Sequence, residues 1–247
     1  MYSIRVSLAF VLLALTALAL TPITLIRPFH RNNMGDICTV VTKVMSWYWG
    51  VRFEYENEER LTPESPRVYI ANHQDTQDMF FAESLLRHGT VSLGKWEVAY
   101  IPFIGWLFFL AGNILIKRSN KEKAAKAMSL AAEKMKKNNL SLLIFPEGTR
   151  NWGKPLPFKL GAFTLAIEAG VPIQPVCVSL RHKTMNYGKY RSGVVKVKCL
   201  KPISTKGLTQ EDAVDLAVRC RKLIEAECIE MTKTVPGYDE QQMEAKK

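Results

Sequence analysis

A histidine and an aspartate five positions apart are the first candidates for chemistry in this sequence. His73 and Asp78 follow a short apolar run, residues 68–71, and precede residues with helical spacing. We therefore expect His73 on the turn that leaves a strand, at the sheet edge where α/β folds bind ligands. Asp78 can then accept a hydrogen bond from one imidazole nitrogen and leave the other nitrogen as a base. The stretch from Asp75 to Asp78 also fits a plain helix N-cap, so this motif alone does not decide.

The second candidate is the sequence Phe-Pro-Glu-Gly-Thr-Arg over residues 145–150. It follows an apolar run, residues 140–145, which has the pattern of a buried strand ended by Pro146. The next residues predict a tight turn in which Gly148 is free to adopt a positive φ. On its own this motif is a turn, and it gains weight only in combination with the histidine motif.

The composition is typical of one globular domain joined to a membrane segment. The chain has 247 residues, of which 47% are hydrophobic and 23% are charged. A formal net charge of +11 indicates an anionic partner, whether nucleic acid, an acidic membrane surface or a phosphorylated substrate. Five scattered cysteines without a C-x-x-C pair argue against a disulfide framework or a zinc site, and they favour a reducing cytosolic setting.

An uncharged apolar stretch near the N-terminus, residues 8–26, is long enough for a membrane-spanning helix. A cleaved signal peptide is the alternative, but the apolar run continues past the candidate cleavage site at residues 17–19. We expect a retained transmembrane or membrane anchor over residues 1–27, the main domain over 28–236 and a polar tail over 237–247. More cations follow the apolar stretch than precede it, which places the main domain on the cytoplasmic side.

The rest of the chain alternates between strand and helix patterns. Strands are predicted over residues 68–71, 90–94, 140–145, 173–180 and 194–200, and helices over 36–53, 120–137, 159–169 and from Thr209 onward. Gly170 is expected to end one of these helices, and Thr209 with Asp212 to begin the last. The alternation predicts an α/β fold with a central, largely parallel sheet flanked by helices, after an N-terminal membrane-anchoring helix.

Two segments allow more than one interpretation. The aromatic residues 47–49 fit a membrane interface and an ordinary core helix equally well. The apolar residues 98–116 are interrupted by Pro102, which favours a buried or partly membrane-embedded segment over a second spanning helix. Residues 54–66 and 152–157 are polar or proline-rich, and we predict loops there.

Four blocks in order along the chain resemble the glycerophospholipid acyltransferase family. His73 and Asp78 match its H-x4-D box, and residues 145–150 match its F-P-E-G-T-R block. Residues 112–118, which end in arginine, and residues 171–176 look like its second and fourth blocks. Each block alone is a weak signal, whereas four in order at compatible spacing are specific. The resemblance covers nearly the whole chain.

The resemblance implies transfer of a fatty acyl group from a thioester, carried by acyl carrier protein or coenzyme A, to a glycerol hydroxyl. The chain looks most like bacterial members that acylate the sn-2 hydroxyl of lysophosphatidic acid, 1-acyl-glycerol-3-phosphate, to give phosphatidic acid in phospholipid biosynthesis. It also implies membrane phospholipids as partners, no nucleic acid, no bound cofactor and no metal. The implied location is the bacterial inner membrane, with the catalytic domain on the cytoplasmic side.

Under this resemblance the site residues take definite roles. His73 is expected to remove the proton from the acceptor hydroxyl, while Asp78 orients the ring and stabilises the imidazolium. Arg150 is expected to hold the acceptor phosphate in a bidentate contact, and Glu147 to hold an arginine or a glycerol hydroxyl. Further candidates for substrate binding are Arg118, Gly148, Thr149, Lys95 and Asn72.

Other functions stay open at this point. The same family fits a different acceptor: glycerol-3-phosphate, another lysophospholipid or a lipid A precursor. A non-catalytic, basic, membrane-anchored lipid-binding protein is a further alternative. A serine hydrolase is excluded because the chain has no Gly-x-Ser-x-Gly elbow. A metal site at His73 is the weaker explanation, because none of the four histidines has H-x3-H spacing.

Overall fold

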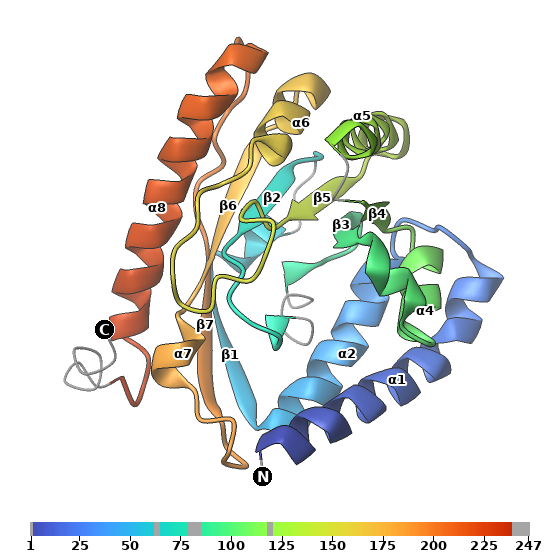
Figure 1. Ribbon diagram of the computed structural model, residues 1–247, viewed down its shortest axis with the longest axis vertical. Helices are drawn as coiled ribbons and strands as arrows, with labels where there is room; N and C mark the ends of the chain where they lie inside the picture. The colour runs from blue at the N-terminus through green and yellow to red at the C-terminus, as the bar shows by residue number, and fades with distance from the viewer. Residues whose placement is uncertain (1, 62–64, 79–84, 118–120, 239–247) are drawn as a thin grey trace.

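The computed structural model of the chain describes residues 2–61, 65–78, 85–117 and 121–238. Within these residues seven strands form one sheet in the order β1-β7-β6-β2-β5-β3-β4 (Figure 1). All neighbouring pairs are parallel except β6 with β7, so the prediction of a largely parallel α/β sheet is confirmed. The strands are β1 (Val51–Glu56), β2 (Val68–Ala71), β3 (Thr90–Lys95), β4 (Ile114–Ile116), β5 (Ser141–Ile144), β6 (Ile173–Val178) and β7 (Gly193–Cys199).

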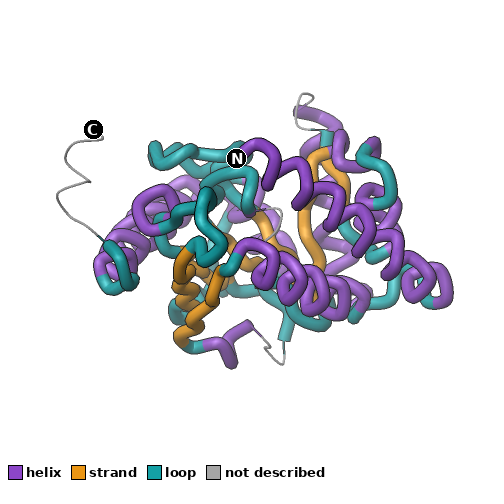
Figure 2. Tube along the Cα trace, turned by 90° about the horizontal axis from the view of Figure 1, so that it is seen from below, coloured by secondary structure: helices purple, strands orange, loops and turns teal. Residues whose placement is uncertain are grey.

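Helices cover both faces of this sheet. They are α1 (Tyr2–Ile26), α2 (Asn33–Trp49), α4 (Ile104–Leu110), α5 (Lys121–Asn138), α6 (Gly161–Ala169), α7 (Arg181–Thr184) and α8 (Ala213–Lys233), with 3-10 turns η1 (Glu58–Leu61), η3 (Trp96–Tyr100) and η4 (Gln210–Asp212). In Figure 1, α5 and α6 lie at the top, α8 runs down the left side, and α1, α2 and α4 lie toward the lower right. Figure 2 shows the strands enclosed between helical segments. Every residue of β2, β5 and β6 is accordingly buried.

Most of the predicted elements are present at the expected positions. Gly170 ends α6 in the left-handed conformation, with φ of 68°. Thr209 and Asp212 form a capping box that leads through η4 into α8. In α5 the predicted apolar face is buried through Ala131 and Met135, while most of its lysines are exposed. The glycine and the capping box therefore stand at the helix ends where the sequence predicted them.

The predicted helix over residues 36–53 is wrong at its C-terminal end. α2 ends at Trp49 because Gly50 adopts the left-handed conformation, with φ of 62°. β1 then begins at Val51 and pairs in parallel with β7. The predicted loop over 54–66 is also partly wrong, since β1 continues to Glu56 and η1 follows. A glycine inside an apolar run was the signal that a helix ends and a strand begins.

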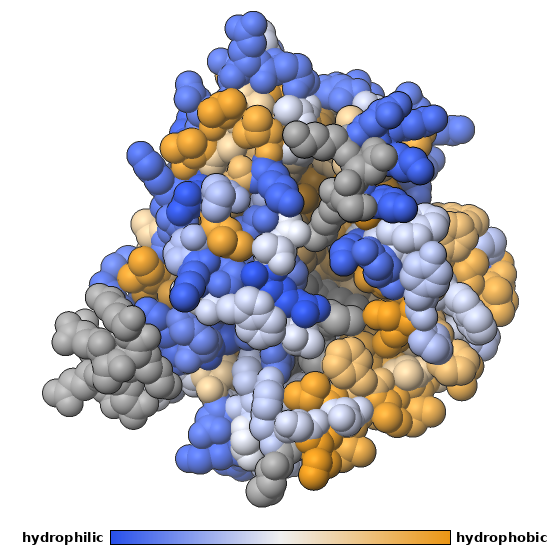
Figure 3. Space-filling model, in the orientation of Figure 1, coloured by the Kyte–Doolittle hydropathy of each residue, from blue (hydrophilic) through white to orange (hydrophobic). Residues whose placement is uncertain are grey.

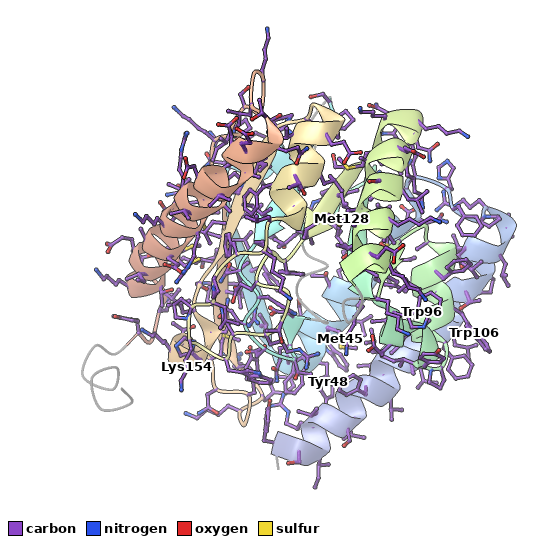
Figure 4. All side chains as sticks on the ribbon, turned by 45° about the horizontal axis from the view of Figure 1, so that its top comes forward. Met45, Tyr48, Trp96, Trp106, Met128 and Lys154 are labelled. Carbon is purple, nitrogen blue, oxygen red and sulfur yellow. The ribbon has the colours of Figure 1, made fainter. Side chains whose placement is uncertain are left out.

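The two ambiguous segments each divide between the alternatives. Trp49 is buried completely, whereas Trp47 has 69% of its surface exposed, so the aromatic group serves both the core and the outer face. Residues 98–116 are three short pieces, comprising most of η3, then α4 and β4, rather than one long helix. Trp96 and Trp106 lie together on the α4 side of the molecule (Figure 4), and both are largely exposed.

Within the described residues, α1 is the one helix long and apolar enough to cross a membrane, by length and composition alone. One of its faces is buried against α2 and α4 through small and apolar side chains at helical spacing: Ala9, Leu13, Ala17 and Leu20. The opposite face is apolar and exposed through Leu8, Val11, Leu15 and Leu18. Hydrophobic atoms accordingly gather at the lower right of the surface, over α1 and α4 (Figure 3).

Both ends of α1 are attached to the rest of the domain. Near the N-terminus, the guanidinium of Arg5 donates to the carbonyl oxygens of Tyr187 at 2.6 Å and Lys189 at 2.5 Å, and it lies 4.9 Å from the ring centroid of Trp49. Just beyond the C-terminal end, the backbone N–H of Phe29 donates to the carbonyl of Leu110 at 2.8 Å. α1 therefore lies along the domain rather than projecting away from it.

Candidate active site

Three neighbouring parallel strands carry the candidate residues to one edge of the sheet. β2 lies between β5 and β6 and is parallel to both. His73 follows the end of β2, Glu147 follows β5, and Arg181 follows β6. Because parallel strands end on the same side, the three turns must meet at their carboxyl edge. The sheet order, rather than closeness in sequence, assembles this site.

Backbone hydrogen bonds join the two predicted motifs directly. The N–H of His73 donates to Oε1 of Glu147 at 2.9 Å. In the other direction, the N–H of Asn151 donates to the carbonyl of His73, and the N–H of Trp152 donates to that of Gln74, both at 2.9 Å. Asn151 therefore contacts the histidine turn directly, and the backbone of Arg150 precedes it by one residue. The backbones of the two turns therefore lie side by side, while phosphate binding by Arg150 stays a prediction.

His73 is held by one ring nitrogen. Its Nδ1 lies 2.7 Å from Oδ2 of Asp78, as the spacing of the two residues predicted. The ring stacks on Phe145, with centroids 4.5 Å apart, and 18% of the side chain remains exposed. Among the described residues, none forms a hydrogen bond with Nε2 of His73. The imidazole is thus fixed in orientation, with a second nitrogen to offer to a substrate.

The carboxylate of Asp78 is buried and ionised. Its Oδ2 also accepts hydrogen bonds from the N–H groups of Gln74 at 2.6 Å and Asp75 at 3.1 Å. Burial alone raises the pKa of Asp78, but the charge of Arg181 and the hydrogen bond to His73 outweigh it and lower the pKa to about 2. An ionised carboxylate can only accept, so Nδ1 of His73 carries the proton and Nε2 of the neutral ring is the acceptor.

Arg181 was missed by the sequence reasoning. Its side chain is 1% exposed, and Nη2 lies 2.5 Å from Oδ1 of Asp78 and 2.9 Å from Oδ1 of Asp75. No motif marks this residue. The available signal was a cation placed three residues after a buried strand, but it becomes meaningful only once β6 is known to lie beside β2.

Glu147 has a different partner from the one expected. It is buried, and its Oε1 accepts from the N–H of His73 and from Nδ2 of Asn151 at 3.0 Å. Its Oε2 has no hydrogen-bond partner within the described chain, and burial raises the pKa of the carboxyl group. Among the described residues no arginine bonds to Glu147. Arg118 lies outside them, so an arginine or a glycerol hydroxyl on Oε2 stays a prediction.

Some of the remaining predicted site residues lie near the His73–Asp78 pair, and others lie apart from it. Asn72 uses its amide oxygen and one amide N–H on the backbone of Val178, at 2.9 Å each, so it holds β2 to β6. It also lines a cavity with Glu147 and Asn151, and substrate binding by its second amide N–H stays a prediction. Gly148 adopts φ of 73° as predicted, Thr149 is exposed and Arg150 is half-buried. Lys95 ends β3, beyond β5, and is paired with Glu97 at 3.0 Å. Arg118 lies outside the described residues.

Phe145 is one of the residues that line a cavity of about 420 Å³. Small residues of α5 and α6 form much of the rest of its wall, together with Met128 of α5. Of the apolar segment 98–116, only Ile116 is among the described residues that line it. The aromatic residue that stacks on His73 thus also lines this cavity.

Comparison with known proteins shows the family of this chain. A family model described as Acyltransferase matches residues 52–179. A 1-acyl-sn-glycerol-3-phosphate acyltransferase of Haemophilus influenzae is 35% identical over 94% of this chain and 97% of its own. The Escherichia coli protein of the same name is 42% identical over 68% of this chain and 69% of its own.

A solved structure shows the same fold. The crystal structure of the 1-acyl-sn-glycerophosphate (LPA) acyltransferase PlsC from Thermotoga maritima matches with a TM-score of 0.64 and 22% identity, over 94% of this chain and 98% of that one. This chain combines the α/β fold with a histidine–aspartate pair at the carboxyl edge of its parallel strands. Fold and sequence motif together indicate an acyltransferase. With a family model and a full-length relative in agreement, this chain belongs to the Acyltransferase family.

Proposed function

We propose that this protein transfers a fatty acyl group from a thioester to the free sn-2 hydroxyl of 1-acyl-glycerol-3-phosphate, which gives phosphatidic acid. The observation that carries the proposal is the pairing of Nδ1 of His73 with the buried carboxylate of Asp78, at 2.7 Å, on the turn after β2. The choice of acceptor is supported by a relative named 1-acyl-sn-glycerol-3-phosphate acyltransferase, whose match covers 94% of this chain.

The reaction needs a base more than it needs a nucleophile on the enzyme. A thioester is an activated acyl donor, whereas an alcohol is a weak nucleophile near neutral pH. Nε2 of His73 takes the proton of the acceptor hydroxyl while the hydroxyl oxygen attacks the thioester carbonyl. The tetrahedral intermediate then collapses, the C–S bond breaks, and the imidazolium returns the proton to the departing thiolate. Asp78 keeps Nδ1 protonated and stabilises the imidazolium between these steps.

Arg150 is our candidate for binding the acceptor phosphate. Its backbone lies beside that of His73, because the next residue, Asn151, donates to the carbonyl of His73. A guanidinium suits a phosphate because its N–H groups can form two parallel hydrogen bonds. Gly148 and Thr149 belong to the same turn and stay as candidates, as does Arg118. Lys95 is a weaker one, since it is exposed and paired with Glu97.

The acyl donor is proposed to be acyl carrier protein or coenzyme A. Both are anionic, and the chain carries a formal net charge of +11. The cavity lined in part by Phe145 offers apolar volume next to the histidine, which suits a donor with a long hydrocarbon chain. No covalent intermediate on the protein is required by this scheme.

Membrane association is proposed to occur through α1, at the cytoplasmic face of a bacterial inner membrane. The exposed face of α1 is apolar, and the exposed aromatic residues Trp96, Tyr100 and Trp106 lie on η3 and α4, the latter of which packs against α1. Since both ends of α1 contact the domain, attachment by this apolar face is better supported than a helix that crosses the bilayer alone.

An acyl-transfer assay on the full chain tests the proposal. Purified protein in detergent is given lysophosphatidic acid with acyl-coenzyme A or with acyl carrier protein, and phosphatidic acid is quantified. His73→Ala is expected to lower kcat by about 10²–10⁴-fold, while the control His30→Ala, at an exposed loop histidine, keeps wild-type activity. Thermal unfolding of both variants verifies the fold. Full activity in His73→Ala contradicts the proposed base, and transfer only to glycerol-3-phosphate or to a different lysophospholipid contradicts the proposed acceptor.

A further inference from the structure

A buried arginine joins the two acidic residues of the histidine turn. Nη2 of Arg181 contacts Oδ1 of Asp78 at 2.5 Å and Oδ1 of Asp75 at 2.9 Å, and the side chain is 1% exposed. Its backbone is fixed as well, because its N–H donates to Oε1 of the buried Gln74 at 2.8 Å. Gln74 is anchored in turn to the carbonyls of Val178 and Ser179 at the end of β6. Arg181 is therefore built into the histidine turn rather than placed beside it.

Arg181 divides the oxygens of Asp78 between two tasks. Oδ1 accepts from Arg181, while Oδ2 accepts from the imidazole of His73. A carboxylate held at both oxygens cannot rotate about its terminal bond, so Oδ2 stays aimed at Nδ1. The arginine also supplies the opposite charge that a buried carboxylate needs in order to remain ionised.

The charge balance around the imidazole follows from the groups that face it. Among the described residues these are Asp75 and Asp78 on the histidine turn, Glu147 after β5, Arg181 after β6 and, beside Arg181, Tyr187. Burial raises the pKa values of Tyr187 and Glu147. Within the ion-pair cluster itself, two carboxylates, those of Asp75 and Asp78, share one cation, Arg181.

We propose that Arg181 is a positioning residue that keeps the His73–Asp78 pair free of an extra proton near neutral pH. Without the arginine, the buried carboxylate of Asp78 and the partly buried carboxylate of Asp75 lose their shared cation, and their repulsion is relieved by one additional proton on the His73–Asp78 pair. That proton inactivates the base in either place. On the imidazole it produces the imidazolium; on Asp78 it makes the carboxyl a donor to Nδ1, which moves the ring proton to Nε2. The inference rests on the proposed role of His73 as the base.

The test is the pH profile of kcat/KM for acyl transfer from acyl-coenzyme A to lysophosphatidic acid, between pH 5.5 and 9.5. For Arg181→Met, the acid limb is expected to move to higher pH by about 1–3 units, with activity regained at alkaline pH. Arg181→Lys keeps the charge, and its acid limb is expected to stay near that of the wild type. Asp75→Asn removes a carboxylate but keeps Oδ1, so its acid limb is expected to move in the opposite direction, to lower pH.

A charge-balanced variant separates charge from packing. Asp75→Asn/Arg181→Met removes one anion and one cation, so its acid limb is expected to return toward that of the wild type. The inference is overturned if the acid limb of Arg181→Met stays at the wild-type pH and kcat/KM falls equally at every pH. It is also overturned if the acid limb of the double variant is shifted as far as that of Arg181→Met. If Arg181→Met does not fold, Arg181→Gln, which keeps hydrogen-bond donors but removes the charge, takes its place in both comparisons. An active His73→Ala contradicts the proposed base itself, whereas unshifted profiles with an inactive His73→Ala reject only the role of Arg181.

Discussion

The backbone N–H of His73 donates a hydrogen bond to Oε1 of Glu147 at 2.9 Å, although 74 positions separate the two residues in sequence. The glutamate of the second motif therefore serves the first motif as a scaffold, since it fixes the turn that presents the imidazole. Asn151, four residues later, shares the same oxygen and also donates its N–H to the carbonyl of His73. The two motifs form one structural unit.

The first prediction concerns this scaffold. Glu147→Ala leaves the partly buried N–H of His73 without its acceptor, which we expect to lower the free energy of unfolding by about 1 kcal/mol and to reduce kcat. Glu147→Gln retains a carbonyl oxygen for the same bond and is expected to keep most of both. Urea unfolding and steady-state kinetics of the two variants measure this difference. Equal losses of kcat and stability in the two variants contradict a scaffold role for Oε1.

The ionisation of Asp78 links stability to acid pH. Its pKa falls from the ordinary value of 3.8 to about 2 in the folded protein, so the folded state binds this proton less readily than the unfolded state. The stabilisation is fully present above about pH 4 and is lost as the pH falls toward 2. Its size is about 2 kcal/mol, since one pKa unit corresponds to about 1.4 kcal/mol.

Unfolding experiments between pH 2 and 7 test this linkage. Wild-type stability is expected to fall more steeply below pH 4 than that of Asp78→Asn, which has no charge to lose at this position. Asp215→Asn, at an exposed position of α8, is the matched control and should follow the wild-type slope. If Asp78→Asn and the wild type lose stability in parallel, the low pKa of Asp78 is not the cause.

Local sequence patterns allowed part of this site to be predicted. The rest depends on which strands are neighbours in the sheet, and short motifs do not encode that order. The contact of His73 with Asp78 spans five positions, so its geometry follows from one turn and can be inferred from spacing. Arg181 depends on β6 being the neighbour of β2, a long-range choice that no short motif encodes. The hydrogen bond between the Asn72 side chain and the backbone of Val178 likewise depends on β6 lying beside β2. Among the elements, β1 was missed because Gly50 lies inside an apolar run in which a helix pattern passes directly into a strand pattern.

Arg150 gives a prediction about the acceptor phosphate. Loss of a charged hydrogen-bond donor typically costs about 1.5–3 kcal/mol, so Arg150→Ala is expected to raise KM for lysophosphatidic acid by about 10–100-fold. KM for the acyl donor should change far less. Arg219→Ala, at an exposed position of α8, removes the same charge from the chain and controls for a general electrostatic effect. Kinetics with each substrate varied in turn provide the comparison, and an unchanged acceptor KM removes Arg150 from the phosphate site.

The last prediction concerns the apolar face of α1. Val11 is 56% exposed on that face, and Val218 on α8 is 49% exposed, so the two valines form a matched pair. If Val11 enters lipid, its burial contributes about 1.5–3 kcal/mol to membrane binding, and Val11→Asp loses at least that amount. We therefore expect Val11→Asp to bind phospholipid vesicles at least about tenfold more weakly than the wild type, whereas Val218→Asp binds normally. Sedimentation with vesicles measures both, and equal binding by the two variants contradicts attachment through this face of α1.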